Sequence, residues 1–144
     1  TGKSQLMPLV LIDRPGGTYW KTWDKHLREH LLRNQLISPE DLNLYNYTDD
    51  VDEAVKLVTR FYRNYHSARF VKDKFVMRLR NAPTPSGLAG LMEDFGDILE
   101  GGEFSVSRAL PGEEEVLDLP RLVFEFDRKS YGRLRQMIDV LNSF

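Results

Sequence analysis

The 144-residue sequence contains no cysteine, so disulfides, thiol nucleophiles and cysteine-ligated zinc sites are excluded. It also lacks an apolar run of the roughly 20 residues that a membrane-spanning helix needs, and we see no pattern of a signal or transit peptide. The net charge is −2: residues 1–67 carry nine basic and nine acidic groups, and residues 68–144 carry eleven and thirteen, so neither half has the basic surface of a nucleic-acid-binding protein. We therefore expect a cytoplasmic protein with neither membrane nor nucleic-acid partners.

Hydrophobic residues make up 41% of the chain and charged residues 29%, which is typical of a globular protein. The length allows one ordinary domain or two small ones. Residues 1–5 resemble the end of a loop that enters a strand. We therefore expect the sequence to be a fragment of a longer protein.

The sequence of the first half predicts strands that alternate with helices, which is the order of elements in a parallel α/β sheet. Residues 6–12 form an apolar run that predicts a strand buried on both faces, with Pro8 tolerated near its beginning. A Pro/Gly loop at 13–17 ends this strand. A helix is expected over 18–35, capped by Thr18. Its buried stripe is expected to comprise Trp20, Trp23, Leu27 and Leu31.

A second strand and helix follow. Ser38 predicts the start of a helical turn, and residues 44–47 predict a short strand. Asp50 and Glu53 form a capping-box pattern for a helix running to about residue 66. One face of that helix is expected to hold Val51, Ala54, Val55, Val58, Phe61, Tyr62 and Tyr65. Two strands cannot cover both faces of a parallel sheet, so we expect this unit to be incomplete.

The second half predicts a different architecture. Strands are expected at 70–71 and 75–79 around a turn at 72–74, at 104–110, and at 122–126. Helices are expected from about 86 to a stop at Gly101-Gly102, and over 130–142. The order strand-helix-strand-strand-helix matches most of a ferredoxin-like βαββαβ module, with its last strand missing or beyond the chain.

His26 to His30 match the pattern H-x-x-E-H, which places two imidazoles one helical turn apart with Glu29 close enough to act as a base. The alternative is two partly buried histidines beside the apolar stripe of an amphipathic helix, and we favour it. A metal site would need a third ligand from a later segment.

The Pro15-Gly16-Gly17-Thr18 loop lies where a helix begins, so its amides could hold a phosphate. No P-loop lysine follows and no G-x-G-x-x-G is present, so a tight turn is the competing interpretation. Open α/β sheets bind ligands at the carboxyl ends of their strands, which gives this position its interest.

Other polar and aromatic clusters have simpler structural interpretations. The acids at 49–53 are explained by helix capping. Glu113 to Glu115 predict a solvated loop. Phe124 and Phe126 could stack bases, but without a basic surface core packing is the better prediction.

Several segments together resemble the carboxyl half of the LONELY GUY (LOG) family, whose members were once labelled possible lysine decarboxylases. The matching stretches are residues 8–12 with Tyr19-Trp20, 36–42, and 48–55. Residues 61–67 and 119–126 resemble the longer bacterial branch of the family, which carries an additional carboxyl-terminal module.

The resemblance implies the fold class and the organisation. It implies an α/β chain: the carboxyl-terminal part of a Rossmann-like parallel sheet at 1–67, then a small α+β ferredoxin-like module (βαββα) at 68–144. Characterised members are phosphoribohydrolases that split cytokinin nucleotide 5′-monophosphates or AMP into base and ribose 5-phosphate. Their signature P-G-G-x-G-T-x-x-E is absent from this sequence, since Tyr19-Trp20 follows Pro15-Gly16-Gly17-Thr18.

We therefore assign no catalytic residue, metal or cofactor to the chain, and expect it to be inactive alone. The parent protein would bind a nucleoside monophosphate and form a homo-oligomer, a dimer by expectation. The alternative is a non-catalytic module for oligomerisation or small-ligand binding. The residues expected at the rim of the substrate pocket or in the dimer contact are Asp13, Arg14, Gly16, Gly17, Thr18 and Tyr19.

Overall fold

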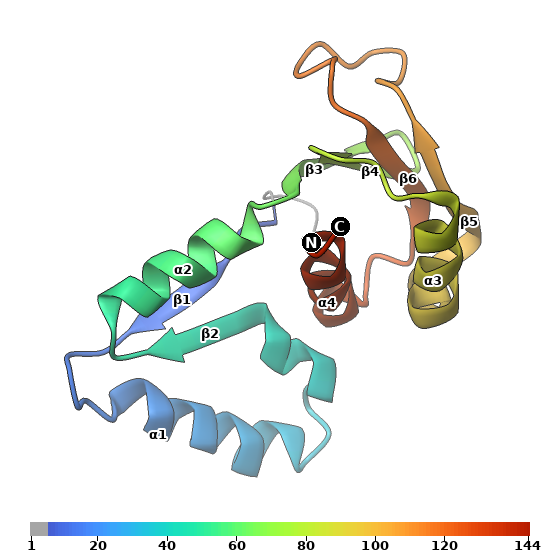
Figure 1. Cartoon of the computed structure of the whole chain (residues 1–144). Coiled ribbons are helices and arrows are strands. Elements are labelled where there is room, and N and C mark those ends of the chain that lie inside the picture. Colours follow the sequence, from blue (N-terminus) through green and yellow to red (C-terminus); the bar gives the residue numbers. More distant parts are fainter. Residues whose placement is uncertain (1–5) are drawn as a thin grey trace.

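A computed structural model describes residues 6–144 and divides them between two sheets (Figure 1). The elements are β1 (Leu9–Ile12), α1 (Tyr19–His26), the π-helix η1 (Leu27–Leu32), the 3₁₀-helix η2 (Pro39–Leu44), β2 (Tyr45–Thr48), α2 (Val51–Phe61), β3 (Tyr65–Val71), β4 (Lys74–Leu79), α3 (Pro85–Phe95), the 3₁₀-helix η3 (Gly96–Ile98), β5 (Leu99–Ser107), β6 (Arg121–Phe126) and α4 (Tyr131–Leu141). The chain is therefore mixed α/β, as predicted.

β1 and β2 form a parallel pair, with Leu9 opposite Tyr45 and Ile12 opposite Thr48. The strand begins at Leu9 rather than at residue 6 because Pro8 has no N–H to donate. The expectation that β1 is buried on both faces is wrong: Leu9 is 52% exposed and Ile12 47%. Among the described residues, β1 pairs only with β2, so one edge of β1 and parts of both faces have no covering element.

The first helix lies close to the predicted range of 18–35, but its cap and its form differ from the prediction. Thr18 makes no side-chain cap, and the helix changes to the π form at Leu27. It stops near Gln35, whose φ of 57° is incompatible with further helix. Its expected buried stripe of Trp20, Trp23, Leu27 and Leu31 is only half-buried.

The capping prediction for η2 is confirmed, and the one for α2 is confirmed in part. Ser38 and Asp41 form a reciprocal capping box at η2. The Asp50 carboxylate accepts hydrogen bonds from the N–H groups of Asp52 and Glu53, at 2.8 and 3.3 Å. The other half of that predicted box differs, since the Asp50 N–H donates to the Thr48 hydroxyl rather than to Glu53.

α2 ends at Phe61, five residues earlier than predicted, and Tyr65 belongs to β3. The reason is distant in sequence: the N–H groups of Asn64 and Tyr65 donate to the Asn142 side chain at 2.8 and 2.9 Å, so they cannot continue the helix. The predicted single apolar face is also divided. Ala54 and Phe61 are buried, whereas the exposed members are Val51, Val55, Val58 and Tyr62.

β3 to β6 form an antiparallel sheet in the order β3-β4-β6-β5. β3, which contains the strand predicted at 70–71, begins earlier than expected and lies at the edge of this sheet beside β4. The helix predicted to run to Gly101 stops at Phe95; Gly101 and Gly102 lie within β5, where the register is irregular. Leu110, placed in this strand by the prediction, follows its end at Ser107.

The hydrophobic core lies almost wholly in the second sheet and its two helices. It includes Phe124 and Phe126, both nearly completely buried, in agreement with core packing rather than base stacking. Before residue 61, Ala54 is the one buried hydrophobic side chain among those the structure describes. The break between the two sheets falls at residues 62–64, and the predicted boundary at 67/68 lies inside β3.

Contacts of α4 help to join the first part of the chain to the second. The Asn142 amide donates to the carbonyl of Phe61 at 2.7 Å, which links α4 to the end of α2. Gly132 in α4 lies directly against the backbone of Glu40 in η2, so closely that a methyl group at position 132 would overlap the Glu40 carbonyl. Figure 1 shows α4 between the two sheets, in the position that these contacts require.

Candidate functional site

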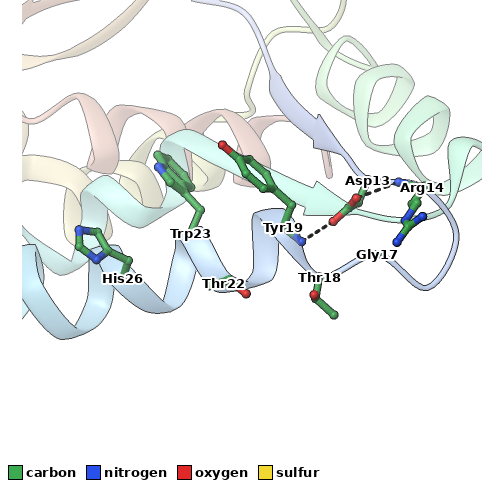
Figure 2. Close-up of a pocket in the computed structure, with 8 residues that line it drawn as sticks. All are labelled: Asp13, Arg14, Gly17, Thr18, Tyr19, Thr22, Trp23 and His26. Atoms are coloured by element: carbon green, nitrogen blue, oxygen red, sulfur yellow. Dashed lines mark hydrogen bonds between the residues drawn. The ribbon is translucent and has the colours of Figure 1, made fainter.

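The loop after β1 lies at the carboxyl end of the parallel pair, where two hollows of about 610 and 350 Å³ adjoin. The structure brings all the residues proposed for the pocket rim to these hollows. The larger one is lined by Asp13, Arg14, Gly17, Thr18, Tyr19, Thr22, Trp23 and His26 (Figure 2). Gly16 lines the smaller one, with Lys21 and Asp49 among its neighbours.

Asp13 organises the loop. One carboxylate oxygen accepts a hydrogen bond from the Arg14 N–H at 2.9 Å, and the other accepts from the Tyr19 N–H at 2.7 Å (Figure 2). Asp13 thereby supplies the helix cap that was expected from Thr18. A side chain at Gly17 would overlap the Asp13 carboxylate, so glycine is required there for close approach.

A second carboxylate closes the loop from the other strand. Asp49, just after β2, accepts a hydrogen bond from the Gly16 N–H at 2.8 Å. Two of the amides that could cradle a phosphate, those of Gly16 and Tyr19, are therefore already bonded to carboxylates. Both carboxylates also repel an anion at this position. The geometry favours the tight-turn interpretation over a phosphate site on these amides.

The larger hollow has an aromatic wall. Tyr19 is 68% exposed, and Figure 2 shows Tyr19, Trp23 and His26 in succession along α1. Trp20 anchors this helix to the strand, because its indole N–H donates to the Ile12 carbonyl at 3.1 Å. Flat aromatic surfaces with polar groups at the margin suit the stacking of a planar ring. The wall offers binding surface, but it presents no carboxylate free to act as an acid or base.

A buried carboxylate on α1 was not predicted. Asp24 accepts from the Arg28 Nε at 2.8 Å and from the Tyr45 hydroxyl at 2.6 Å. The hydrogen bond from Arg28 lowers the pKa of Asp24, while burial and the neighbouring Asp24 raise the pKa of Tyr45 to about 12. These bonds hold α1 against β2. The pairing could not be found in the sequence, since Tyr45 lies 21 residues away.

The histidine pair is close but exposed. The rings of His26 and His30 lie 4.5 Å apart between centroids. Within residues 6–144, no third histidine, cysteine, aspartate or glutamate joins them in a metal-binding group. The favoured alternative, two partly buried histidines beside the apolar stripe, is wrong about their burial, since both side chains are exposed.

A charged cluster lies on the face of the antiparallel sheet that α3 and α4 leave free. Arg78 and Arg121 are directly opposite across β4 and β6, and the Glu113 carboxylate bridges them with bonds of 3.0 Å to each. The prediction of a fully solvated loop is wrong at Glu113, whose side chain is entirely buried. Burial raises the pKa of Glu113, but bonds from Arg121, the Leu110 N–H and Arg78 outweigh it and hold the pKa at about 2.

This cluster is self-contained. Arg121 also donates to the Val116 carbonyl at 2.9 Å, so one arginine fixes both the acid and the backbone of the loop. The run of three glutamates did not predict this cluster, because both arginine partners lie in strands outside the loop.

No family model, curated protein or solved structure matches this chain. Among the described residues, no helix combines the length and apolar character that crossing a membrane requires.

Proposed function

We propose that this chain is the carboxyl-terminal part of a LOG-like nucleoside 5′-monophosphate phosphoribohydrolase. The observation that carries the proposal is the β1-α1-β2 unit. It is a parallel pair with apolar side chains, Leu9 and Ile12, left half exposed on β1. Parallel sheets occur almost only with both faces covered, so these strands suit the end of a larger Rossmann-like sheet.

The second sheet suits the ferredoxin-like module of the longer LOG branch. β4, α3 and β5 form a crossover in which β6 lies between the two strands. This strand order resembles the split βαβ arrangement of ferredoxin-like folds, with β3 as the further strand beside β4, and so supports the proposal.

In this proposal the chain contributes a binding surface and not the catalytic groups. The aromatic wall of Tyr19 and Trp23 would receive the flat base of a nucleotide at the rim of the pocket. The carboxylate and the phosphate-binding amides would come from the amino-terminal half, because Asp13 and Asp49 occupy the loop amides in this chain.

Release of ribose 5-phosphate from AMP tests the proposal. We expect release by the full-length parent and none by residues 1–144 alone. Intact mass of the natural protein would establish whether a longer parent exists. Release by this chain alone would overturn the assignment of the catalytic groups to another segment, and an inactive parent would overturn the enzyme assignment.

A second candidate function is an assembly module without catalysis. The exposed apolar side of α2, with Val51 63% and Val55 56% exposed, favours it. An inactive parent that still assembles through this surface would support the second candidate over the first.

A further inference from the structure

Arg78 is a buried cation that is held tightly at one end and loosely at the other. Its side chain is 4% exposed, and its Nε and Nη2 donate to the Glu113 carboxylate at 3.1 and 3.0 Å. The contacts of the remaining nitrogen, Nη1, are longer: 3.4 Å to the Ser67 hydroxyl and 3.5 Å to the Glu115 carboxylate. Good N–H···O bonds measure about 2.7–3.2 Å. The Glu113 bridge therefore leaves Nη1 able to donate to a closer acceptor.

The buried charges of this cluster do not balance. Arg78 and Arg121 are both buried, and they share one buried carboxylate, that of Glu113. Glu115 brings a second negative charge to Arg78, but its side chain is 76% exposed and lies at the longer distance. Burying a charge is costly unless an opposite charge lies in close contact with it. The excess positive charge therefore favours a small anion beside Nη1.

Strand β3 supplies further donors on the same face of the sheet. Ser67 is directly opposite Arg78 in the register of β3 and β4, and its hydroxyl lies 2.9 Å from Nδ1 of His66. Arg69 follows two residues later and so faces the same side; its guanidinium makes a long contact of 3.4 Å with the Gly112 carbonyl. Hydroxyl and guanidinium groups are typical donors to the oxygens of phosphates and carboxylates.

We propose that Arg78 Nη1, the Ser67 hydroxyl and Arg69 form a binding site for a small oxyanion, which displaces the exposed Glu115 carboxylate. Glu113 stays in place and continues to bridge the two buried arginines. Glu115 is then an internal competitor that covers the site until an anion binds. Phosphates and carboxylates share this chemistry. Phosphate carries more negative charge near pH 7 than a single carboxylate, so it should bind more tightly than acetate.

Amide NMR of the 144-residue chain, titrated with inorganic phosphate at constant ionic strength, tests the proposal. We expect saturable shifts at Ser67, Arg78 and Glu115, with a dissociation constant on the order of 1 mM. Glu115→Gln removes the competing carboxylate and should tighten binding about tenfold, because like charges at close range repel. Glu114→Gln makes the same charge change at the exposed neighbouring residue. It is the matched control and should change the affinity less than about twofold.

Two further measurements define the site. Ser67→Ala removes a donor and should weaken phosphate binding about fivefold or more, with the unliganded spectrum verifying that the variant is folded. Unchanged affinity in this variant would overturn the role of the hydroxyl. Sodium acetate in place of phosphate distinguishes the two ligand classes, and tighter binding of acetate would overturn the preference for phosphate.

The comparison of the two glutamine variants decides the proposal. Equal affinities of Glu115→Gln and Glu114→Gln would overturn it, as would the absence of saturable shifts in Glu115→Gln up to about 50 mM phosphate. Shifts confined to the loop after β1 would overturn it as well, because they would place the anion on the other sheet. These results do not depend on nucleotide hydrolysis, so the proposed function is tested separately.

Discussion

At the level of single residues, the buried Glu113 makes the most specific contacts on the antiparallel sheet. Glu113 separates two arginines that would otherwise face each other unshielded across β4 and β6. Like charges directly opposite in a sheet are destabilising. The acid therefore stabilises the sheet as well as holding the loop that carries it.

Replacing Glu113 by Gln should lower the free energy of unfolding by about 3–5 kcal/mol, because it leaves buried charges uncompensated. Urea denaturation at pH 7 measures this. Glu114→Gln, in the exposed part of the same loop, is the control and should change stability by less than about 0.5 kcal/mol. Equal effects of the two substitutions would contradict the bridging role.

The Glu113 carboxyl also makes the free energy of unfolding depend on pH. Its pKa is about 2 in the folded chain and 4.5 ordinarily, so the unfolded state binds the proton more tightly. The stabilisation is complete above the unfolded pKa and is lost as pH falls from about 4.5 toward 2. Denaturation between pH 7 and pH 2 should show this loss in the wild type and a smaller one in Glu113→Gln. A parallel decline in both proteins would refute the assignment.

At Gly17 the constraint is steric. Any side chain there would meet the Asp13 carboxylate, which caps the first helix through the Tyr19 N–H. We expect Gly17→Ala to destabilise the chain by about 1–3 kcal/mol, measured by thermal unfolding. Gly90→Ala is the control, since a methyl group at position 90 meets open space, and it should be neutral or slightly stabilising.

At the scale of elements, local sequence signals predicted the starts of helices well and their ends poorly. Ser38 and Asp50 cap as expected because a cap needs only the next three residues. The end of α2 depends on Asn142, which is 78 residues from Asn64. No local pattern could reveal that partner.

Candidate site residues divide in the same way. The loop residues from Asp13 to Tyr19 could be found because a strand end, a Pro/Gly turn and a helix start adjoin in sequence. The hydrogen bond from Gly16 to Asp49 and the bond from Arg78 to Glu113 could not be predicted, since the bonded residues lie 33 and 35 residues apart in the sequence. The exposure of β1 also escaped the prediction, because an apolar run indicates burial without saying what covers it.

At the scale of the whole molecule, the two parts of the chain are held together where α4 meets η2. Gly132→Ala should separate or distort this contact, because the methyl group would overlap the rigid Glu40 backbone. We expect the substitution to lower the free energy of unfolding by about 1–3 kcal/mol. We also expect it to speed amide exchange more in η2 than in β6. Unchanged exchange in η2 would contradict a tight contact there.

We propose that this chain forms the end of a larger α/β enzyme whose catalytic groups lie in the rest of that enzyme. The most direct test is a ribose 5-phosphate assay with AMP on two samples, residues 1–144 alone and the full-length parent. We expect release by the parent only. Release by residues 1–144 alone, or by neither sample, would contradict it.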